Sequence, residues 1–352
     1  MYRRQLLRAA GGLSLTGLGG YLQDDEINVG MVYALGGLGD NSFNDMALGG
    51  IQQASEEFGV EFQNAEPGSA SDIPSLQRRF ARSQNPDYEL ICTIGFIQKE
   101  GLQRNAEQFP DQDFVIVDEV VEQDNVASFV FKEEQGSFQV GHLAGVMTSR
   151  DFDVGDGETN DELTVGFVGG REVPLIEKFE AGYRAGVAYA DADVEVLSAY
   201  AQSFSDPARG REIASSMYED GADVIYHAAG GTGNGVFRAA EEQGRYAIGV
   251  DADQSESISE FSGVIIASMV KRVDQAVFTA VESVVEDSFE GAVNELGLEN
   301  DGIEAVIGQD FTDEVPEDVT EALAASREAI IDGDIEVPTD PAEVGETTTT
   351  AN

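Results

Sequence analysis

The stretch at residues 27–45 reads INVGMVYALGGLGDNSFND. Its apolar first part predicts a buried strand, the glycines after it predict a tight turn, and the polar run before Phe43 predicts a helix start. Further strand-like runs are VEFQNA, YELICTIG, DFVIVD and VASFVF, with helical segments expected around 43–58, 73–84 and 96–109. This alternation predicts a parallel sheet covered by crossover helices.

A second series of the same kind begins after the acidic loop DFDVGDGETNDE. Its expected strands are LTVGFVGG, VEVLSAY, DVIYHAA and YAIGVD, and its expected helices lie at about 174–190, 207–220 and 234–243. A further strand, GVIIASMV, leads into a helix at about 271–288 that we expect to return to the first lobe. The sequence thus predicts an α/β protein with two doubly wound, Rossmann-like lobes.

The expected boundaries follow from these two series. The predicted parts are an export signal at 1–26, a first lobe at 27–129 plus about 252–288, a second lobe at 130–251 plus about 289–335, and a disordered acidic tail at 336–352. We expect the chain to cross between the lobes near 128–131, 251–255 and 288–292.

Two aromatic residues follow strands at the expected binding edge. Ligands of such sheets bind beyond the carboxyl ends of the strands. Phe43 follows the first strand, and Phe204 follows VEVLSAY in the second series. Either ring could simply anchor a helix start in the core. Because the two positions are equivalent, the pattern favours two rings that face each other across a cleft and stack on a flat ligand.

Charged residues end three further strands. Asp118 ends DFVIVD, Asp251 ends YAIGVD, and Lys271 follows GVIIASMV. The acids could cap a helix, bind a metal or accept hydrogen bonds from a ligand. Only four lysines occur (Lys99, Lys132, Lys178, Lys271), so a lysine at a strand end suggests a specific ammonium role, with an exposed helix start as the alternative.

The composition limits the possible partners. The chain has 67 acidic and 20 basic residues, a formal net charge of -47. Such a surface repels nucleic acid. The acids are scattered along the chain, which indicates a host that lives at high salt. The alternative is one acidic patch for a cationic ligand.

The N-terminus resembles a twin-arginine export signal. Arg3 and Arg4 precede a weakly apolar, glycine-rich run, which is too short for a membrane span. The sequence therefore predicts a protein that works outside the cytoplasm. Tyr21 stands where a lipid-modified cysteine would follow LTGLGG, so the sequence leaves lipid anchoring by that route open.

No catalytic or metal-binding motif emerges. Cys92 is the only cysteine and lies in an apolar strand, so neither a disulfide nor a thiol zinc cluster is expected. His227 could line the cleft, while His142 is expected to be structural; their spacing suggests no metal site. Binding without turnover, cofactor or metal is the simpler prediction.

Several ordered blocks resemble one known family. These are GGLGDNSFND, ICTIGF, FVIVDE with NVASFVFKEEQGSFQVGHLAG, VGFVGGREVPLIEKFEAGYRAG, SFSDPARGREIASSMYEDGADVIYHAAGGTGNGV, and AIGVDADQ with IIASMVKRVDQAV. They are similar to the basic membrane protein family of substrate-binding lipoproteins over about residues 27–310. The resemblance implies a type I periplasmic-binding-protein fold with three crossing strands, and a purine nucleoside delivered to an ABC permease and ATPase.

The resemblance also implies roles for single residues. Phe43 and Phe204 would sandwich the base, Asn44 and Asp118 would meet its polar edge, Asp251 and Lys271 would bind the ribose hydroxyls, and the backbone at Gly230 and Gly231 would close on the sugar. One departure concerns the base. Family members with known nucleoside specificity have an aspartate where this chain has Ala34, so the resemblance leaves the base open.

Three functional classes fit the sequence. A monomeric transport receptor is favoured over a sensory receptor and over an enzyme that acts on nucleosides. An enzyme would need an acid or base poised on the ligand. A DNA-binding regulator of the same lobe fold is disfavoured because no basic helix-turn-helix precedes Ile27.

Overall fold

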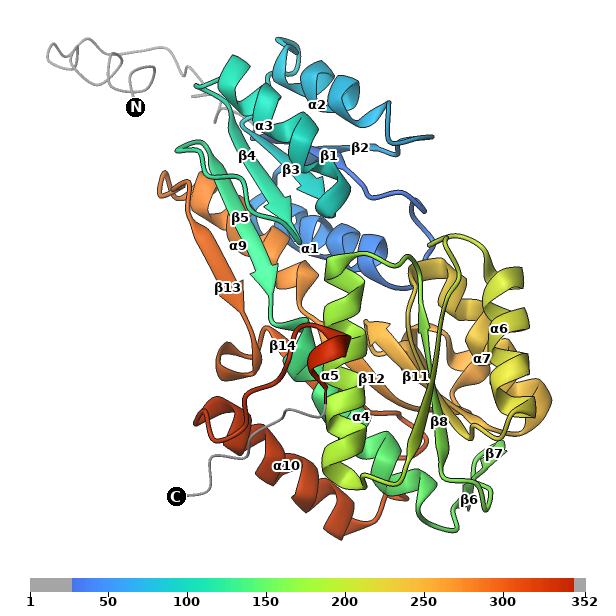
Figure 1. Ribbon diagram of the computed structural model, residues 1–352. Coiled ribbons are helices and arrows are strands. Elements are labelled where there is room, and N and C mark those ends of the chain that lie inside the picture. Colours follow the sequence, from blue (N-terminus) through green and yellow to red (C-terminus); the bar gives the residue numbers. More distant parts are fainter. Residues whose placement is uncertain (1–26, 345–352) are drawn as a thin grey trace, which may run out of the picture.

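In the computed structural model, which describes residues 27–344, the chain forms two α/β lobes (Figure 1). The elements of the first lobe are β1 (Asn28–Val32), α1 (Phe43–Phe58), β2 (Glu61–Ala65), α2 (Ile73–Ala81), β3 (Leu90–Ile94), α3 (Lys99–Gln108), β4 (Asp113–Val117), β5 (Val126–Phe131), α9 (Val273–Val285) and β13 (Val293–Leu296). Its six-stranded sheet has the order β13-β5-β4-β3-β1-β2, with parallel neighbours throughout.

The second lobe is built on the same plan. Its elements are α4 (Glu133–Thr148), β8 (Thr164–Gly169), α5 (Pro174–Ala190), β9 (Glu195–Tyr200), α6 (Pro207–Glu219), β10 (Val224–Ala228), α7 (Asn234–Gln243), β11 (Tyr246–Asp251), α8 (Gln254–Ser257), β12 (Ile265–Lys271), β14 (Ile303–Ile307) and α10 (Glu317–Ile331), with a small hairpin of β6 (Asp153–Val154) and β7 (Gly157–Glu158). The sheet order is β14-β12-β11-β10-β8-β9, and only β14 is antiparallel to its neighbour. The predicted pair of doubly wound α/β lobes is therefore confirmed.

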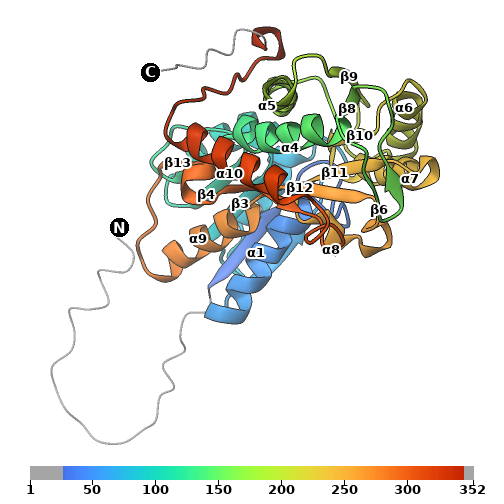
Figure 2. The same ribbon diagram turned by 90° about the horizontal axis from the view of Figure 1, so that it is seen from below.

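The chain crosses between the two sheets three times. The first crossing lies between Phe131 of β5 and Glu133 of α4, the second between Lys271 of β12 and Val273 of α9, and the third in the segment that joins β13 to β14. Figure 2 shows α9 beside α1, so the helix predicted to return to the first lobe does so.

The positions of two crossings correct the predicted boundaries. The sequence analysis placed about 252–288 in the first lobe, but β12 is hydrogen-bonded to β11 and belongs to the second sheet. The second crossing is therefore at residues 271–273, and the third lies at about 297–302 rather than 288–292. Both hydrogen-bonding edges of β12 are used within the second sheet, by β11 on one side and β14 on the other.

The C-terminal part of the chain requires a second correction. Residues 336–344 were predicted to be disordered, yet Val337 and Val344 pack against the main hydrophobic core, and a short turn at Pro341–Glu343 lies beside α5. These apolar side chains can be buried, which the neighbouring acids obscured in the sequence. The remaining tail, 345–352, and the predicted export signal, 1–26, lie outside the described residues.

Close helix packing beneath the cleft fixes α4 against α5. A Cβ atom on Gly186 would lie 2.0 Å from the carbonyl oxygen of Phe138, and one on Gly141 would lie 2.2 Å from that of Tyr183. Such distances are possible only for glycine, so the two backbones touch. This contact holds the N-terminal turns of both helices, which carry Glu133 and Ile176, at the wall of the cleft described below.

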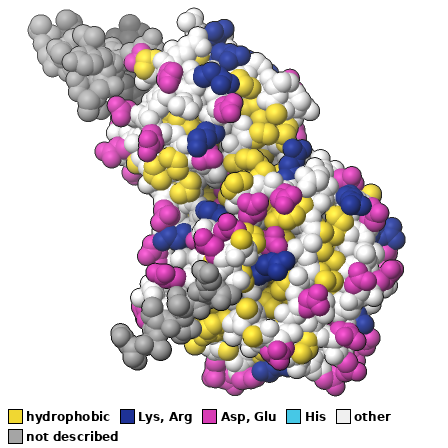
Figure 3. Space-filling model, in the orientation of Figure 1, with side chains coloured by type: hydrophobic (Ala, Val, Ile, Leu, Met, Phe, Trp, Pro, Cys, Tyr) yellow, Lys and Arg dark blue, Asp and Glu magenta, His cyan; other side chains and the backbone are white. Residues whose placement is uncertain are grey.

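The surface carries the excess of acids. On the face shown in Figure 3, Asp and Glu side chains are spread over both lobes rather than gathered in one patch. None of the helices within residues 27–344 is long and apolar enough to cross a membrane.

Candidate ligand-binding site

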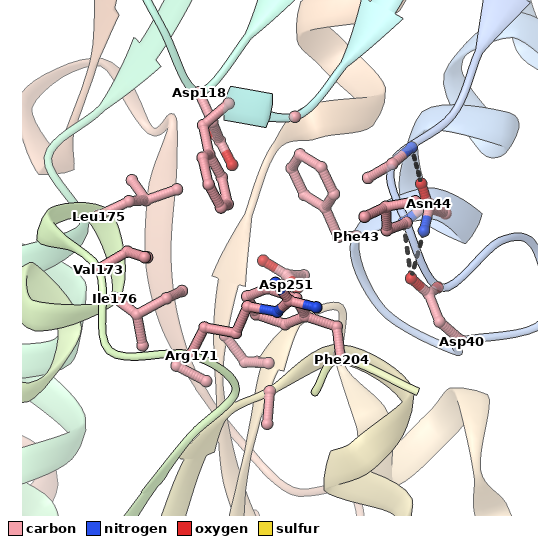
Figure 4. A pocket seen from close by; sticks show the side chains of 18 of the residues that line it. Asp40, Phe43, Asn44, Asp118, Arg171, Val173, Leu175, Ile176, Phe204 and Asp251 are labelled. Carbon is pink, nitrogen blue, oxygen red and sulfur yellow. Dashed lines mark hydrogen bonds between the residues drawn. The ribbon is translucent and has the colours of Figure 1, made fainter. Parts of the chain in front are cut away.

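A cavity lies between the lobes, at the carboxyl ends of the strands of both sheets (Figure 4). Its empty volume is about 910 Å³, part of which is open to solvent. It is lined by Ala34, Leu35, Asp40, Phe43, Asn44, Gly95, Phe96, Ile97, Asp118, Arg171, Val173, Leu175, Ile176, Phe179, Phe204, Ala228, Ala229, Gly230, Val250, Asp251 and Lys271. Mostly apolar walls with a few convergent charged groups are typical of a small-molecule site.

The loop after β1 is shaped by one buried carboxylate. Asp40 accepts hydrogen bonds from the backbone N–H groups of Ser42 and Asn44, at 3.0 Å each, and so caps the start of α1. Burial raises the pKa of Asp40 to about 6, although these N–H groups oppose the rise. Ser42 directly precedes α1, but its side chain forms no cap hydrogen bond.

Asn44 holds the same loop from the other side. Its Nδ2 donates to the Gly37 carbonyl oxygen and to Asp40, both at 3.0 Å, and its Oδ1 accepts from the Ala34 N–H at 2.9 Å. Both amide hydrogens are thus used, and only one lone pair of Oδ1 is left for a ligand. The structure gives Asn44 a role in positioning the loop.

Aromatic rings from both lobes line the cavity. Phe43 and Phe204 are both half-buried, and Figure 4 shows both rings at the cavity. The ring of Phe204 stands edge-on to Phe96 of the first lobe, with centroids 6.5 Å apart. The ring also packs directly against Gly170, where a Cβ atom would lie 2.3 Å from the ring. The rings therefore offer apolar faces to a flat ligand.

A buried ionic cluster forms the wall next to the crossings. The Nζ of Lys271 lies 2.7 Å from Asp118 and 3.4 Å from Glu133, and the three side chains are at most 5% exposed. The ammonium group also lies 4.9 Å from the ring centroids of Phe43 and Phe131. Burial alone would lower the pKa of Lys271, but Asp118, Glu133 and Asp251 raise it above its ordinary value, so the ammonium stays charged.

Asp251 ends β11 and joins the lobes across the cleft. It accepts a hydrogen bond of 2.5 Å from the hydroxyl of Ser42, which belongs to the first lobe. A second interlobe hydrogen bond of 2.9 Å runs from Nε2 of Gln254 to the carbonyl oxygen of Asn41. Asp251 and Asp118 end equivalent strands, and both have left-handed backbone conformations with φ of 66° and 70°. Such strain in non-glycine residues is typical of functional sites.

Seven of the eight predicted ligand-binding residues line this cavity. They are Phe43, Asn44, Asp118, Phe204, Gly230, Asp251 and Lys271. The eighth, Gly231, lies just outside it, where a Cβ atom would be 3.7 Å from the Cβ of Asp40 in the other lobe. His227 is fully buried behind the wall and bonds to Gln254, and His142 is buried near Ser326.

Sequence reasoning missed other residues of the site. Asp40, Phe96 and Arg171 all follow strands, so the rule that located Phe43 also applied to them. Nothing in the sequence indicated that Glu133 lies near the site, because an acid in the first turn of a helix is usually solvated. The apolar wall of Leu175, Ile176 and Phe179 comes from α5, where it resembles an ordinary core face. Within residues 27–344, no group of three His, Cys, Asp or Glu side chains is placed to hold a metal ion.

Comparisons with known proteins identify the family. Residues 27–340 match the family described as "Bmp: ABC transporter substrate-binding protein PnrA-like". The chain is 35% identical to the "CD4+ T-cell-stimulating antigen" of Listeria monocytogenes, over 90% of this chain and 89% of that one. It is 31% identical to the "ABC transporter nucleoside-binding protein BmpA" of Lactococcus lactis, over 89% of each chain.

A solved structure agrees with these relatives. The solute-binding protein of an ABC transporter system from Aeropyrum pernix superposes with a TM-score of 0.80 at 29% identity, covering 91% of this chain and 96% of that one. The chain therefore belongs to the Bmp family of PnrA-like ABC transporter substrate-binding proteins.

Proposed function

We propose that the protein captures a nucleoside, with a purine favoured, in the interlobe cavity and delivers it to the permease of an ABC importer. The observation that carries this proposal is the combination of two half-buried rings from opposite lobes with a charged group of Asp251, Lys271 and Asp118 in one cavity. Aromatic faces suit a base, and buried charged donors and acceptors suit the hydroxyl groups of a ribose. The relative from Lactococcus lactis, named as nucleoside-binding, supports the same assignment.

In this proposal each side chain has a defined task. Phe43 and Phe204 stack on the two faces of the base, Asp251 accepts hydrogen bonds from the ribose hydroxyl groups, and Lys271 donates to their oxygens. Asp118 holds Lys271 in place and provides a further hydrogen-bond acceptor for the ligand. The backbone at Gly230 and Gly231 closes on the sugar, and Asn44 acts mainly through the loop that it holds.

We also propose that the protein works as a monomer on the outer face of the cell membrane. The twin arginines Arg3 and Arg4 support export. Capture without turnover fits this location, because the permease and ATPase would then carry out the transport step.

The two rings should contribute similarly to nucleoside binding. We expect Phe43→Ala and Phe204→Ala each to weaken inosine binding by about 1–3 kcal/mol, because a stacked base loses one of its two platforms. Isothermal titration calorimetry in molar KCl measures this loss. The matched control is Phe58→Ala, since Phe58 is equally half-buried but packs against Phe278, outside the cavity.

Two results would contradict this assignment. If wild-type protein binds no nucleoside, the proposed ligand class is wrong. If the two ring variants bind inosine as wild type does but unfold at lower denaturant concentration, as Phe58→Ala should, the rings serve only the core.

Ligand should also change the shape of the protein. The interlobe hydrogen bonds of Asp251 and Gln254 belong to a closed form, and a bound ligand would add contacts to both lobes only in that form. We therefore expect saturating inosine to decrease the radius of gyration measured by small-angle X-ray scattering. An unchanged radius with bound inosine would show that the lobes do not close on the ligand.

A further inference from the structure

Arg171 lies at the cavity next to the proposed base platform. It follows β8 and directly succeeds Gly170, whose backbone is seated on the ring of Phe204. In Figure 4 the Arg171 side chain extends from the second lobe in the direction of Phe204 and Asp251. A base stacked on Phe204 would therefore present an edge within the region that this guanidinium group can reach.

The guanidinium group of Arg171 is available for a ligand. Several arginines elsewhere on the surface are held by carboxylates, for example Arg150 by Asp318 at 2.6 Å and Arg184 by Glu180 at 2.7 Å, whereas Arg79 and Arg82 stack on phenylalanine rings. Among residues 27–344, no carboxylate lies within 4.0 Å of the Arg171 guanidinium, although the chain has 67 acids. Arg171 is the arginine among residues 27–344 that lines the cavity, and without a carboxylate partner its guanidinium group is free to bind a ligand group there.

The chemistry of a guanidinium group limits what that ligand group can be. Arginine only donates hydrogen bonds, so the facing atoms must be acceptors. Ala34, on the opposite lobe of the cavity, neither donates nor accepts through its side chain. A phosphate would be repelled by Asp40, Asp118 and Asp251 in the same cavity. A neutral edge with two adjacent acceptors is the better match.

Among purines, the 6-oxo compounds carry such an edge. O6 and N7 of guanine or hypoxanthine accept together from one arginine, which is the commonest specific contact between arginine and a base. Adenine presents an amino group instead of O6, and its N–H would face the N–H groups of the guanidinium. The same arginine that favours one base therefore disfavours the other.

We propose that Arg171 is a specificity-determining residue that makes the site prefer 6-oxopurine nucleosides, inosine and guanosine, to adenosine. This inference rests on the proposed nucleoside-binding function. In this proposal the base is selected by Arg171 of the second lobe, because Ala34 of the first lobe has no polar side chain to do so.

The test compares inosine with adenosine, which differ at the atoms that Arg171 would meet. By calorimetry in molar KCl, we expect wild type to bind inosine about 10- to 100-fold more tightly than adenosine. Arg171→Met should lose most of that preference by weakening inosine binding while leaving adenosine binding within about threefold of wild type. Arg171→Lys keeps the charge but not the two-pronged geometry, so it should restore only part of the preference.

A control and three further outcomes complete the test. Arg209→Met removes an exposed arginine that is paired with Glu212 on α6, outside the cavity, and should leave both affinities unchanged. If Arg171→Met weakens the binding of both nucleosides equally, or the binding of neither, Arg171 does not select the base and the inference is wrong. The proposed binding of nucleosides would still stand. If wild type binds neither compound, the proposed function fails and the inference fails with it.

Discussion

Lys271→Met is expected to lower the free energy of unfolding by about 3–5 kcal/mol and to remove most of the affinity for nucleosides. The substitution leaves Asp118 and Glu133, which lie 2.7 and 3.4 Å from the ammonium group, buried without their cation. Methionine has a similar length and fills the space between the rings of Phe43 and Phe131. The expected losses therefore come from the missing charge rather than from a cavity. Urea unfolding measures the first loss and inosine calorimetry the second.

The stability loss should depend on pH in a defined direction. Burial already raises the pKa of Asp118 to about 7 in the presence of the cation, and removal of Lys271 raises it further. A carboxyl group whose pKa is higher in the folded than in the unfolded protein destabilises the fold above that folded pKa. The penalty relaxes as the pH falls toward the unfolded value of about 3.9, because the folded form then takes up a proton. Lys271→Met should therefore be least harmful in mildly acidic buffer.

Two variants keep this prediction testable. Lys178→Met removes the other cation near Glu133, but Lys178 is 33% exposed and Glu133 keeps Lys271 at 3.4 Å, so the loss should be smaller than that of Lys271→Met. The double variant Asp118→Asn/Lys271→Met removes one stranded carboxylate and should recover part of the stability without restoring inosine binding. Equal losses in the two lysine variants would show that the buried cluster has no special role. A destabilised Lys271→Met protein that binds inosine normally would remove Lys271 from the ligand site.

Much of this arrangement was predictable from residue order. The carboxyl ends of parallel strands meet at one edge of each sheet, so Phe43, Phe204 and Asp251 could be assigned to a cleft before any coordinates. The assignment of β12 to a lobe failed because GVIIASMV is apolar on both faces and would suit either sheet. Its partner becomes known only through the register with β11.

Side-chain pairing was beyond the sequence. Lys271 and Asp118 are far apart in the chain and come from different lobes, so their ion pair depends on where the chain crosses between the sheets. Glu133 is only 1% exposed because α4 begins at a crossing, where its first turn faces the cavity wall rather than solvent. The hydrogen-bond partners of Asn44 depend on the left-handed glycines Gly36, Gly37 and Gly39, which fold the loop back on it.

Asp251→Asn should separate recognition of the sugar from recognition of the base. Asparagine keeps an acceptor for the Ser42 hydroxyl and tolerates the left-handed φ of 66° at this position, so the interlobe contact should survive. What is lost is the charge that strengthens hydrogen bonds from the ribose hydroxyl groups, worth about 1.5–3 kcal/mol in a water-excluding cleft. We therefore expect about a 10- to 100-fold weaker affinity for inosine and almost no change for hypoxanthine, which lacks the sugar.

The comparison is made by calorimetry in molar KCl, where salt screens the surface acids more than a buried group. Asp253→Asn is the matched control, because Asp253 lies two residues away, caps α8 and does not line the cavity. Equal losses for inosine and hypoxanthine would mean that the substitution disturbs closure rather than a sugar contact. An unchanged inosine affinity would mean that Asp251 serves the contact with Ser42 alone, and the ribose would then have to lie elsewhere in the cavity.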